Sequence, residues 1–289
     1  MDQLTKGKNI DVSRVGFSAP KVLDNGAKLV YVNYNGGKFC VQTPWMTMPW
    51  AMSCFSEGPY PKYSAELSFK GMDDSGKDAL ELQQFHDKLI ELEGKIVDAG
   101  VENSVSWFKK KTNSREVIEA LFNPIVKVSK DKETGEPNGK YPPTFKAKVP
   151  QMNKNWEVKV FNTEGRQYQI NDAESGDNLE DILVKYSKVR AIIQCVGLWV
   201  ASGNFMCQWK LVKAEVDVPG NSGTHDFLPD SDDEDGDSDN QATEDTGNDG
   251  PQMLDDSSDE EDDDDQGEPS PEPQPVVKKT VRKKKVAKK

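Results

Sequence analysis

The sequence contains few residues of the kinds that build metal centres, disulfide frameworks and catalytic dyads. Only two histidines and four cysteines occur in 289 residues. The cysteines form two widely spaced pairs in the sequence, Cys40 with Cys54 and Cys195 with Cys207, and no CxxC or CxxxH spacing occurs. This pattern argues against a zinc site and against a Cys–His nucleophile. We therefore expect no metal, no cofactor and reduced thiols.

Long uncharged runs are also scarce. Two segments lack charge, Phe39–Ser56 and Ala191–Trp209. Pro44 and Pro49 interrupt the first, and the turn residues 202–204 lie in the middle of the second, so neither is expected to span a membrane. The N-terminal residues include no apolar stretch typical of a signal peptide. We expect an intracellular protein that does not enter a membrane.

Charge is distributed very unevenly along the chain. Residues 1–220 carry 28 acidic and 29 basic residues, and they hold all six tryptophans. The stretch Asp226–Glu272 has 22 acidic residues and no Lys or Arg, whereas Lys278–Lys289 has 8 basic residues and no acid. Only the first part can bury a core. The sequence predicts one folded domain at 1–220, a disordered acidic tail at 221–275 and a basic C-terminal segment at 276–289.

The periodicity of apolar residues predicts a mainly β (α+β) fold with one long helix. Leu82, Phe85, Leu89, Leu92 and Ile96 recur at helical spacing, which predicts a helix over Lys77–Ala99 that ends at Gly100. The predicted strands are Lys28–Asn33, Lys38–Gln42, Ile125–Ser129, Thr144–Val149, Trp156–Phe161, and a long hairpin of Lys188–Val200 with Phe205–Val216. Further short helices are predicted at Ser114–Phe122 and Asn178–Ser187. These elements favour a small antiparallel barrel over a sandwich. The loop tryptophans Trp45 and Trp50 are expected to fill the core.

One motif suggests nucleotide hydrolysis but lacks the residues that the chemistry needs. Residues 71–77 match G-x-x-x-x-G-K before the long helix, but Asp78 stands where Mg²⁺ binding needs Ser or Thr. Asp73 and Asp74 would repel phosphate inside the loop. No Ser–His–Asp or G-x-S-x-G arrangement occurs either. The sequence predicts that the protein is not an enzyme.

Aromatic residues next to lysines are the best candidates for a binding surface. Bases offer faces for stacking and the backbone offers one charge per nucleotide, so this mixture suits single-stranded nucleic acid. Strand alternation puts Lys146 and Lys148 on one face of 144–149, and Phe145, Ala147 and Val149 on the other. The alternative for each aromatic is a place in the core beside solvated lysines. The candidate residues are Trp107, Phe108, Lys109, Lys110, Lys111, Arg115, Lys140, Tyr141, Lys146, Lys148, Trp156 and Lys159.

The acidic tail suggests a competitor for that surface. A run of carboxylates can occupy a cationic groove in place of nucleic acid, or dock on basic partners; the alternative is that it only maintains solubility. Ser231, Ser257 and Ser258 each have an acidic residue three positions on, which predicts phosphorylation by an acidophilic kinase. The basic end could be a nuclear localisation signal, a DNA contact or an arm that folds back on the acidic run.

Three segments, Lys140–Pro150, Trp156–Phe161 and Val189–Lys213, carry a family resemblance. Together with the tail, they resemble the single-stranded-DNA-binding proteins of nucleocytoplasmic large DNA viruses, relatives of a phage replication protein with one OB-fold and an acidic tail. The resemblance implies an OB-fold with an inserted helix, and a role in viral DNA replication, recombination or repair. It also implies that the tail competes with DNA and recruits a polymerase, helicase or primase. The basic end departs from the phage pattern, where the chain ends in an aromatic residue.

We therefore predict a non-enzymatic, sequence-tolerant single-stranded-DNA-binding protein of the host nucleus or a cytoplasmic viral factory, with a homodimer and presence in the virion left open. One alternative is an acidic histone-chaperone-like or nuclear scaffold protein that uses the tail. Another is a structural virion protein.

Overall fold

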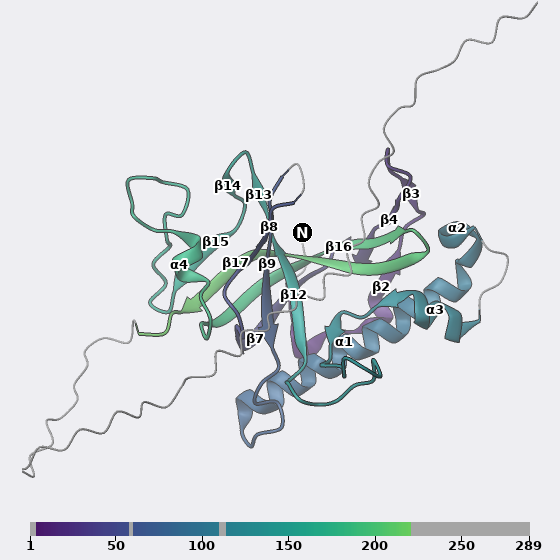
Figure 1. Cartoon of the computed structure of the whole chain (residues 1–289), viewed down its shortest axis with the longest axis horizontal. Coiled ribbons are helices and arrows are strands. Elements are labelled where there is room, and N and C mark those ends of the chain that lie inside the picture. Colours follow the sequence, from purple (N-terminus) through teal and green to yellow (C-terminus); the bar gives the residue numbers. More distant parts are fainter. Residues whose placement is uncertain (1–3, 58–59, 110–113, 221–289) are drawn as a thin grey trace, which may run out of the picture. The chain divides into compact units, whose positions relative to one another are not determined.

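The computed structural model describes residues 4–57, 60–109 and 114–220, and these are mostly β with one long helix (Figure 1). The strands are β1 (Leu4–Lys6), β2 (Val15–Phe17), β3 (Lys21–Val22), β4 (Lys28–Val30), β5 (Val32–Tyr34), β6 (Gly37–Lys38), β7 (Cys40–Thr47), β8 (Ser53–Phe55), β9 (Lys62–Ser68), β10 (Phe122–Asn123), β11 (Val126–Lys127), β12 (Thr144–Val149), β13 (Gln151–Met152), β14 (Asn155–Trp156), β15 (Lys159–Asn162), β16 (Lys188–Ala201) and β17 (Asn204–Asp217). The helices are η1 (Gly7–Asn9), η2 (Val12–Arg14), α1 (Lys77–Glu102), α2 (Ser104–Phe108), α3 (Arg115–Leu121) and α4 (Leu179–Ile182). None of the helices in these ranges is long and apolar enough to cross a membrane.

Five strands of the main sheet pair in a closed ring. β7 pairs with β9, β9 with β12, β12 with β17, β17 with β16, and β16 again with β7. The hairpin of β16 and β17 makes this possible, because each strand has 14 residues and contacts several neighbours along its length. The predicted terminal hairpin is thus confirmed. The expectation of a wholly antiparallel sheet is wrong where β12 pairs with β17, since that pairing is parallel.

The core lies inside this ring and under α1. Phe39, Phe145 and Trp209 are at most 2% exposed, and the rings of Phe39 and Phe145 lie 5.3 and 5.9 Å from that of Trp209. Phe85 of α1 packs against Phe145 from the helix side, at 6.4 Å. The residues that set the helical period of α1, including Leu82, are all buried, as their spacing predicts.

α1 continues past the glycine that the sequence suggested as its end. The helix runs to Glu102, and Gly100 is buried within it. A Cβ added to Gly100 would lie 2.8 Å from Cγ2 of Ile118 on α3. The glycine is therefore needed for the close approach of α3 and does not mark a helix end.

Other predictions were right in kind and inexact in extent. The long-looped hairpin after Pro124 is present, with β11 antiparallel to β12. The loop expected around Trp45 is instead part of β7, which extends to Thr47. Trp50 was expected to fill the core, but it is 57% exposed. That prediction is wrong because the ring lies outside the sheet, against the ammonium of Lys185.

Candidate nucleic-acid interface

β12 presents two lysines on its outer side. Phe145, Ala147 and Val149 are at most 2% exposed, whereas Lys146 and Lys148 between them are exposed. The strand alternation predicted from the sequence is thus confirmed. The inner residues anchor β12 to the core, so the two lysine side chains project from a fixed backbone.

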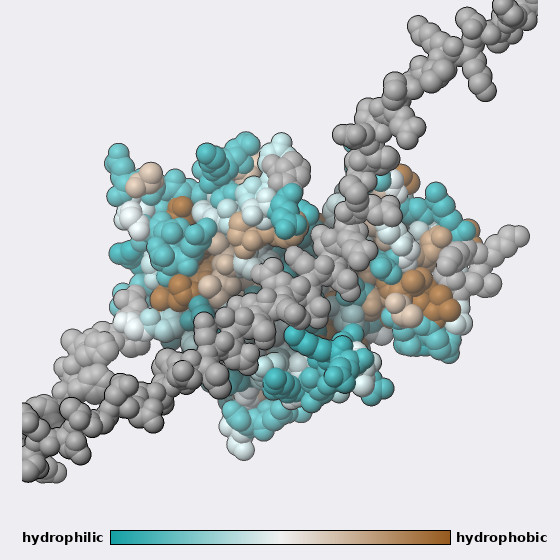
Figure 2. All heavy atoms as spheres, viewed as in Figure 1, coloured by the Kyte–Doolittle hydropathy of each residue, from teal (hydrophilic) through white to brown (hydrophobic). Residues whose placement is uncertain are grey.

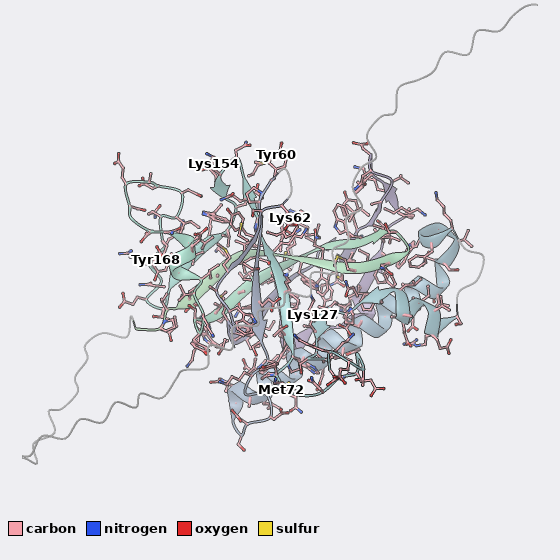
Figure 3. All side chains as sticks on the ribbon, in the orientation of Figure 1. Tyr60, Lys62, Met72, Lys127, Lys154 and Tyr168 are labelled. Atoms are coloured by element: carbon pink, nitrogen blue, oxygen red, sulfur yellow. The ribbon has the colours of Figure 1, made fainter. Side chains whose placement is uncertain are left out.

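Neighbouring strands add three more lysines to the same side. Lys148 is paired with Lys210 of β17 and with Ser64 of β9, which shares its face with Lys62. Lys127 of β11 is paired with Thr144, at the other end of β12. Figure 3 shows Lys62 and Lys127 toward opposite ends of β12. We call Lys62, Lys127, Lys146, Lys148 and Lys210 the lysine face. Glu66 of β9 lies among them, with a carboxylate oxygen 3.9 Å from Nζ of Lys146.

A β-bulge extends the cationic surface along β17. Ile192 of β16 pairs with Lys213 and Ile193 pairs with Leu211, so Val212 is the extra residue. Because one residue is skipped, Lys213 points to the same side as Lys210 although the two are three positions apart. Lys213 is also paired with Lys159 of β15. The bulge therefore brings the predicted candidates Lys148 and Lys159 to one side of the sheet, beside two lysines of β17.

A groove of about 540 Å³ opens beside Lys213. Its lining includes Phe161 of β15, Arg190 and Ile192 of β16, and Glu215 of β17. The Lys213 ammonium lies 5.5 Å from the centroid of the Phe161 ring. Arg190 lies 5.0 Å from the ring of Trp45, and its Nε donates to Glu215 at 3.2 Å. We call this feature the groove; it combines cations and aromatic rings, the two components that single strands require.

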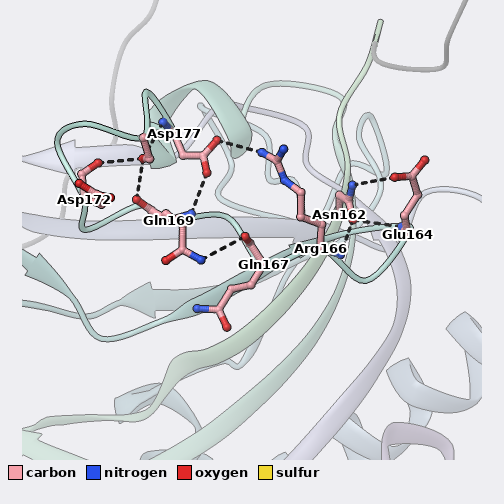
Figure 4. Close-up of polar contacts among 8 residues, drawn as sticks. Asn162, Glu164, Arg166, Gln167, Gln169, Asp172 and Asp177 are labelled. Carbon is pink, nitrogen blue, oxygen red and sulfur yellow. Dashed lines mark hydrogen bonds and ion pairs between the residues drawn. The ribbon is translucent and has the colours of Figure 1, made fainter.

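The wall of the groove at residues 162–165 is held by a network of polar contacts (Figure 4). Oδ1 of Asn162 accepts from the backbone N–H groups of Glu164 and Arg166, at 3.1 and 2.8 Å. Arg166 then reaches Asp177, whose other carboxylate oxygen accepts from the backbone of Gln169 at 2.7 Å. The turn is fixed by these side chains, so the groove does not depend on a ligand for its shape.

Trp107, a predicted stacking residue, belongs to the core. It is 2% exposed and packs against Phe17 and Phe205, at ring distances of 5.8 and 6.3 Å. Lys28 holds this segment: its ammonium donates to the carbonyls of Ser106 and Trp107 at 2.5 and 2.9 Å. Burial, followed by the charge of Lys109, lowers the pKa of Lys28. The alternative left open for Trp107, a core aromatic beside solvated lysines, is the one that the structure favours.

Three other candidates near Trp107, namely Phe108, Lys109 and Arg115, do not join the lysine face in the structure. Phe108 is half-buried against Phe205, and Lys109 is exposed at the end of α2. Arg115 is paired with Asp98 and with Glu119, so its charge is already balanced. Lys110 and Lys111 lie outside the described residues.

Figure 2 shows apolar side chains over α2 and α3, where Val105 is 60% and Val117 is 42% exposed.

The remaining candidates lie in three places. Trp156 is half-buried, with its ring 4.7 Å from that of Tyr63. Burial, then a hydrogen bond from the Tyr63 hydroxyl to Cys54, raises the pKa of Tyr63. Lys140 lies over the ring of Tyr141, which is 60% exposed in the loop before β12. The proposed phosphorylation sites Ser231, Ser257 and Ser258 lie outside the described residues, as does the tail.

Sequence reasoning missed several residues that the structure brings together. Lys62 lies between Tyr60 and Tyr63, so the pattern of rings and lysines was available as a signal for it. The other three, Lys127, Lys210 and Lys213, have only Trp209 close by in the sequence, and its ring is buried. The alternation of apolar and polar residues around position 210 could have indicated that Lys210 faces outward from its strand. The pairing of Lys213 with Lys159 depends on a contact between distant segments, and no local pattern predicts it.

Comparisons with known proteins give only partial likenesses. No protein-family model matches the chain, and no curated protein matches it in sequence. Similar solved structures include the single-stranded DNA-binding protein from bacteriophage Enc34 in complex with ssDNA, at 9% identity and TM-score 0.36, covering 69% of this chain and 90% of that chain. The same phage protein alone aligns at 14% identity and TM-score 0.32, over 72% and 96% of the two chains. Its C-terminal truncation aligns at 12% and 0.31, over 70% and 92%.

Likeness at this identity and TM-score establishes neither a shared fold nor a shared function. The relation to proteins of large DNA viruses stays a prediction.

Proposed function

We propose that this protein binds single-stranded DNA with little dependence on sequence, through the lysine face and the groove. The observation that carries the proposal is the convergence of five lysines, from β9, β11, β12 and β17, beside Glu66. Lysines that neutralise phosphates release the counterions condensed on the DNA, and this release supplies much of the binding free energy. Phe161 and Trp45, each beside a cation, offer rings on which bases of a single strand can stack.

The test is a set of charge-removing variants of the full chain. The triple variant Lys146→Ala, Lys148→Ala, Lys210→Ala removes lysines of the lysine face, and Lys77→Ala, Lys88→Ala, Lys95→Ala removes three from α1 as a matched control. We expect the first variant to weaken binding to oligo(dT) strongly and to reduce the slope of log K against log salt by about 0.7 for each phosphate that is no longer neutralised. The control variant should change neither the oligo(dT) affinity nor the salt slope by a comparable amount. Binding that is absent in the wild-type chain, or equal in both variants, would contradict the proposal.

The same experiment separates the rival functions. An acidic chaperone or scaffold would bind histones through the tail, and a structural virion protein would need neither the lysine face nor oligo(dT). Both rivals expect no salt-dependent binding to oligo(dT). The lysine face itself favours a polyanionic ligand over a basic partner, because like charges repel.

Finer parts of the proposal rest on the sequence. We propose that the ring of strands is an OB-fold barrel with α1 inserted, since five strands close the ring. We also propose a role in viral DNA replication, recombination or repair, in the host nucleus or a viral factory. The acidic tail would compete with DNA and recruit a polymerase, helicase or primase, and acidophilic kinases would phosphorylate Ser231, Ser257 or Ser258.

A further inference from the structure

We infer that Trp50, Lys185 and Tyr186, here called the aromatic clamp, form a second contact for the same DNA strand by stacking on bases beyond the groove. The inference rests on the proposed single-strand binding and adds a site that the sequence did not suggest. Trp50 is 57% and Tyr186 is 60% exposed. The ammonium of Lys185 lies 5.1 Å from the centroid of each ring. The clamp thus repeats the combination of ring and cation found in the groove.

The backbone under the clamp is fixed. The N–H of Tyr186 donates to the carbonyl of Met48 at 2.8 Å, and the N–H of Met48 donates to Ser187 at 2.9 Å. On the other side of Trp50, the N–H of Met52 donates to Leu183 at 2.9 Å. These bonds join the segment after β7 to the segment before β16. Both rings therefore project from a preformed platform, and binding has little ordering left to impose on the backbone.

Tyr186 adopts a backbone conformation that its side chain does not favour. Its φ is 70°, in the left-handed region that glycine and asparagine occupy with little strain. Backbone strain of this kind gathers at binding sites, where the surroundings hold a side chain in a useful place. Lys109, Lys154 and Ser202 share this left-handed conformation, so the strain supports the inference together with the exposure of the ring and its place beside Lys185.

The outer positions of β16 connect the clamp to the lysine face. Gln194 is paired with Lys210 and Ile192 with Lys213, and the next outer positions are Arg190 at the groove and Lys188. Lys185 and Tyr186 of the clamp lie just before Lys188 in the chain. From Gln194 to Lys188 the strand spans about 20 Å. A few nucleotides laid along β16 would therefore reach from the lysine face through the groove to the clamp.

The charges along this route favour nucleic acid over a peptide. Arg190 is bonded to Glu215, and Lys188 stands beside Asp217 in the strand register. Lys213 adds a cation at the groove, between the lysine face and Lys185. A strand that places phosphates on these lysines and bases on the rings uses every one of these groups. A peptide would have to be acidic and aromatic to do the same.

The test compares full-chain variants for oligo(dT) affinity over a range of salt concentrations. Trp50→Ala removes one ring, and Tyr186→Asn removes the other while keeping a residue that tolerates the left-handed region. Tyr31→Ala is the matched control, because Tyr31 is also exposed, at 43%, and lies outside the proposed route. Melting temperatures should match the wild type, since both clamp rings are mostly exposed. We expect each clamp variant to weaken binding about 5- to 150-fold with an unchanged salt slope, because stacking releases no counterions.

The outcomes distinguish this inference from the proposed function. If the clamp variants bind like the wild type while the lysine-face triple variant binds weakly, the clamp is not on the DNA route and this inference is wrong, although the proposed function stands. If neither set weakens binding, both are wrong. If a clamp variant lowers the salt slope as a lysine variant does, the rings do not stack and the inference is also overturned. Trp50→Phe supplies a second readout, because it should remove much of the tryptophan quenching that oligo(dT) causes.

Discussion

Glu93 is a carboxylate held largely inside the protein, on α1. It accepts a hydrogen bond from the backbone N–H of Val126 at 2.8 Å and so fastens β11 to the helix. Burial raises the pKa of Glu93, and the hydrogen bonds from Val126 and Ile125, with the nearby His86, offset this only in part. The cost of burying the charge exceeds the gain from its partners.

This arrangement predicts a pH-dependent loss of stability. Because the folded-state pKa of Glu93 is raised, the native state holds the proton more tightly than the unfolded chain. The stabilising contribution is present below the unfolded pKa and is lost as pH rises through the folded pKa. Glu93→Gln should remove this pH-dependent loss of stability, while its amide Oε1 can still accept the hydrogen bond from the backbone N–H of Val126. Urea unfolding at a series of pH values, with the exposed Glu102→Gln as control, measures it. A wild-type profile that Glu93→Gln leaves unchanged would contradict the prediction.

The sequence predicts Trp50 in the core and Trp107 at a binding surface. In the structure Trp50 is exposed and Trp107 is buried. Trp107 stands beside three lysines, which indicated a binding surface, and Trp50 lies in an uncharged run, which indicated a core. Burial is decided by contacts with distant residues: Phe17 and Phe205 cover Trp107. No local pattern contains that information, so adjacency of rings and lysines could not separate the two tryptophans.

Among the elements, those with a regular period were predictable and those set by irregularities were not. The alternation of β12 placed Lys146 and Lys148 correctly, and the helical period found α1. A strict period of two puts Lys210 and Lys213 on opposite faces. The bulge at Val212 puts them on one face, and it arises from pairing with β16. Regular alternation could therefore predict Lys146, Lys148 and Lys210 on outer positions of their strands, but not that Lys213 lies on the same side as Lys210.

A second irregularity in the hairpin gives a prediction for β16. Gly197 has φ of 143°, and a Cβ there would lie 2.6 Å from the carbonyl oxygen of Val30 on β4. Gly197→Ala should therefore strain the backbone and push β4 away, lowering the free energy of unfolding by about 2–4 kcal/mol. Gly16→Ala on β2 is the control, since no heavy atom lies within 4 Å of an added Cβ. Chemical denaturation measures both. Equal stability of the two variants would show that β4 accommodates the extra carbon.

The whole chain combines a nearly neutral body with a strongly charged end. Residues 1–220 carry 29 basic and 28 acidic residues, so the lysine face is a local concentration of charge and does not reflect the body's average. The 22 carboxylates of Asp226–Glu272 are joined to that body by a short stretch of chain. A tethered polyanion is present at an effective concentration in the millimolar range, which permits it to compete with DNA for the lysine face.

Tail truncations test this competition. We compare the full chain with a chain ending at Pro275, which lacks the basic end, and one ending at Gly220, which lacks the acidic run as well. The chain ending at Pro275 should bind oligo(dT) most weakly, because nothing neutralises its carboxylates. Full length should be intermediate and the chain ending at Gly220 strongest. The differences should shrink as salt rises, since screening weakens the tail and DNA contacts together. Equal affinities of all three at low salt would show that the tail does not compete for the lysine face, which would leave it a role in solubility or partner binding.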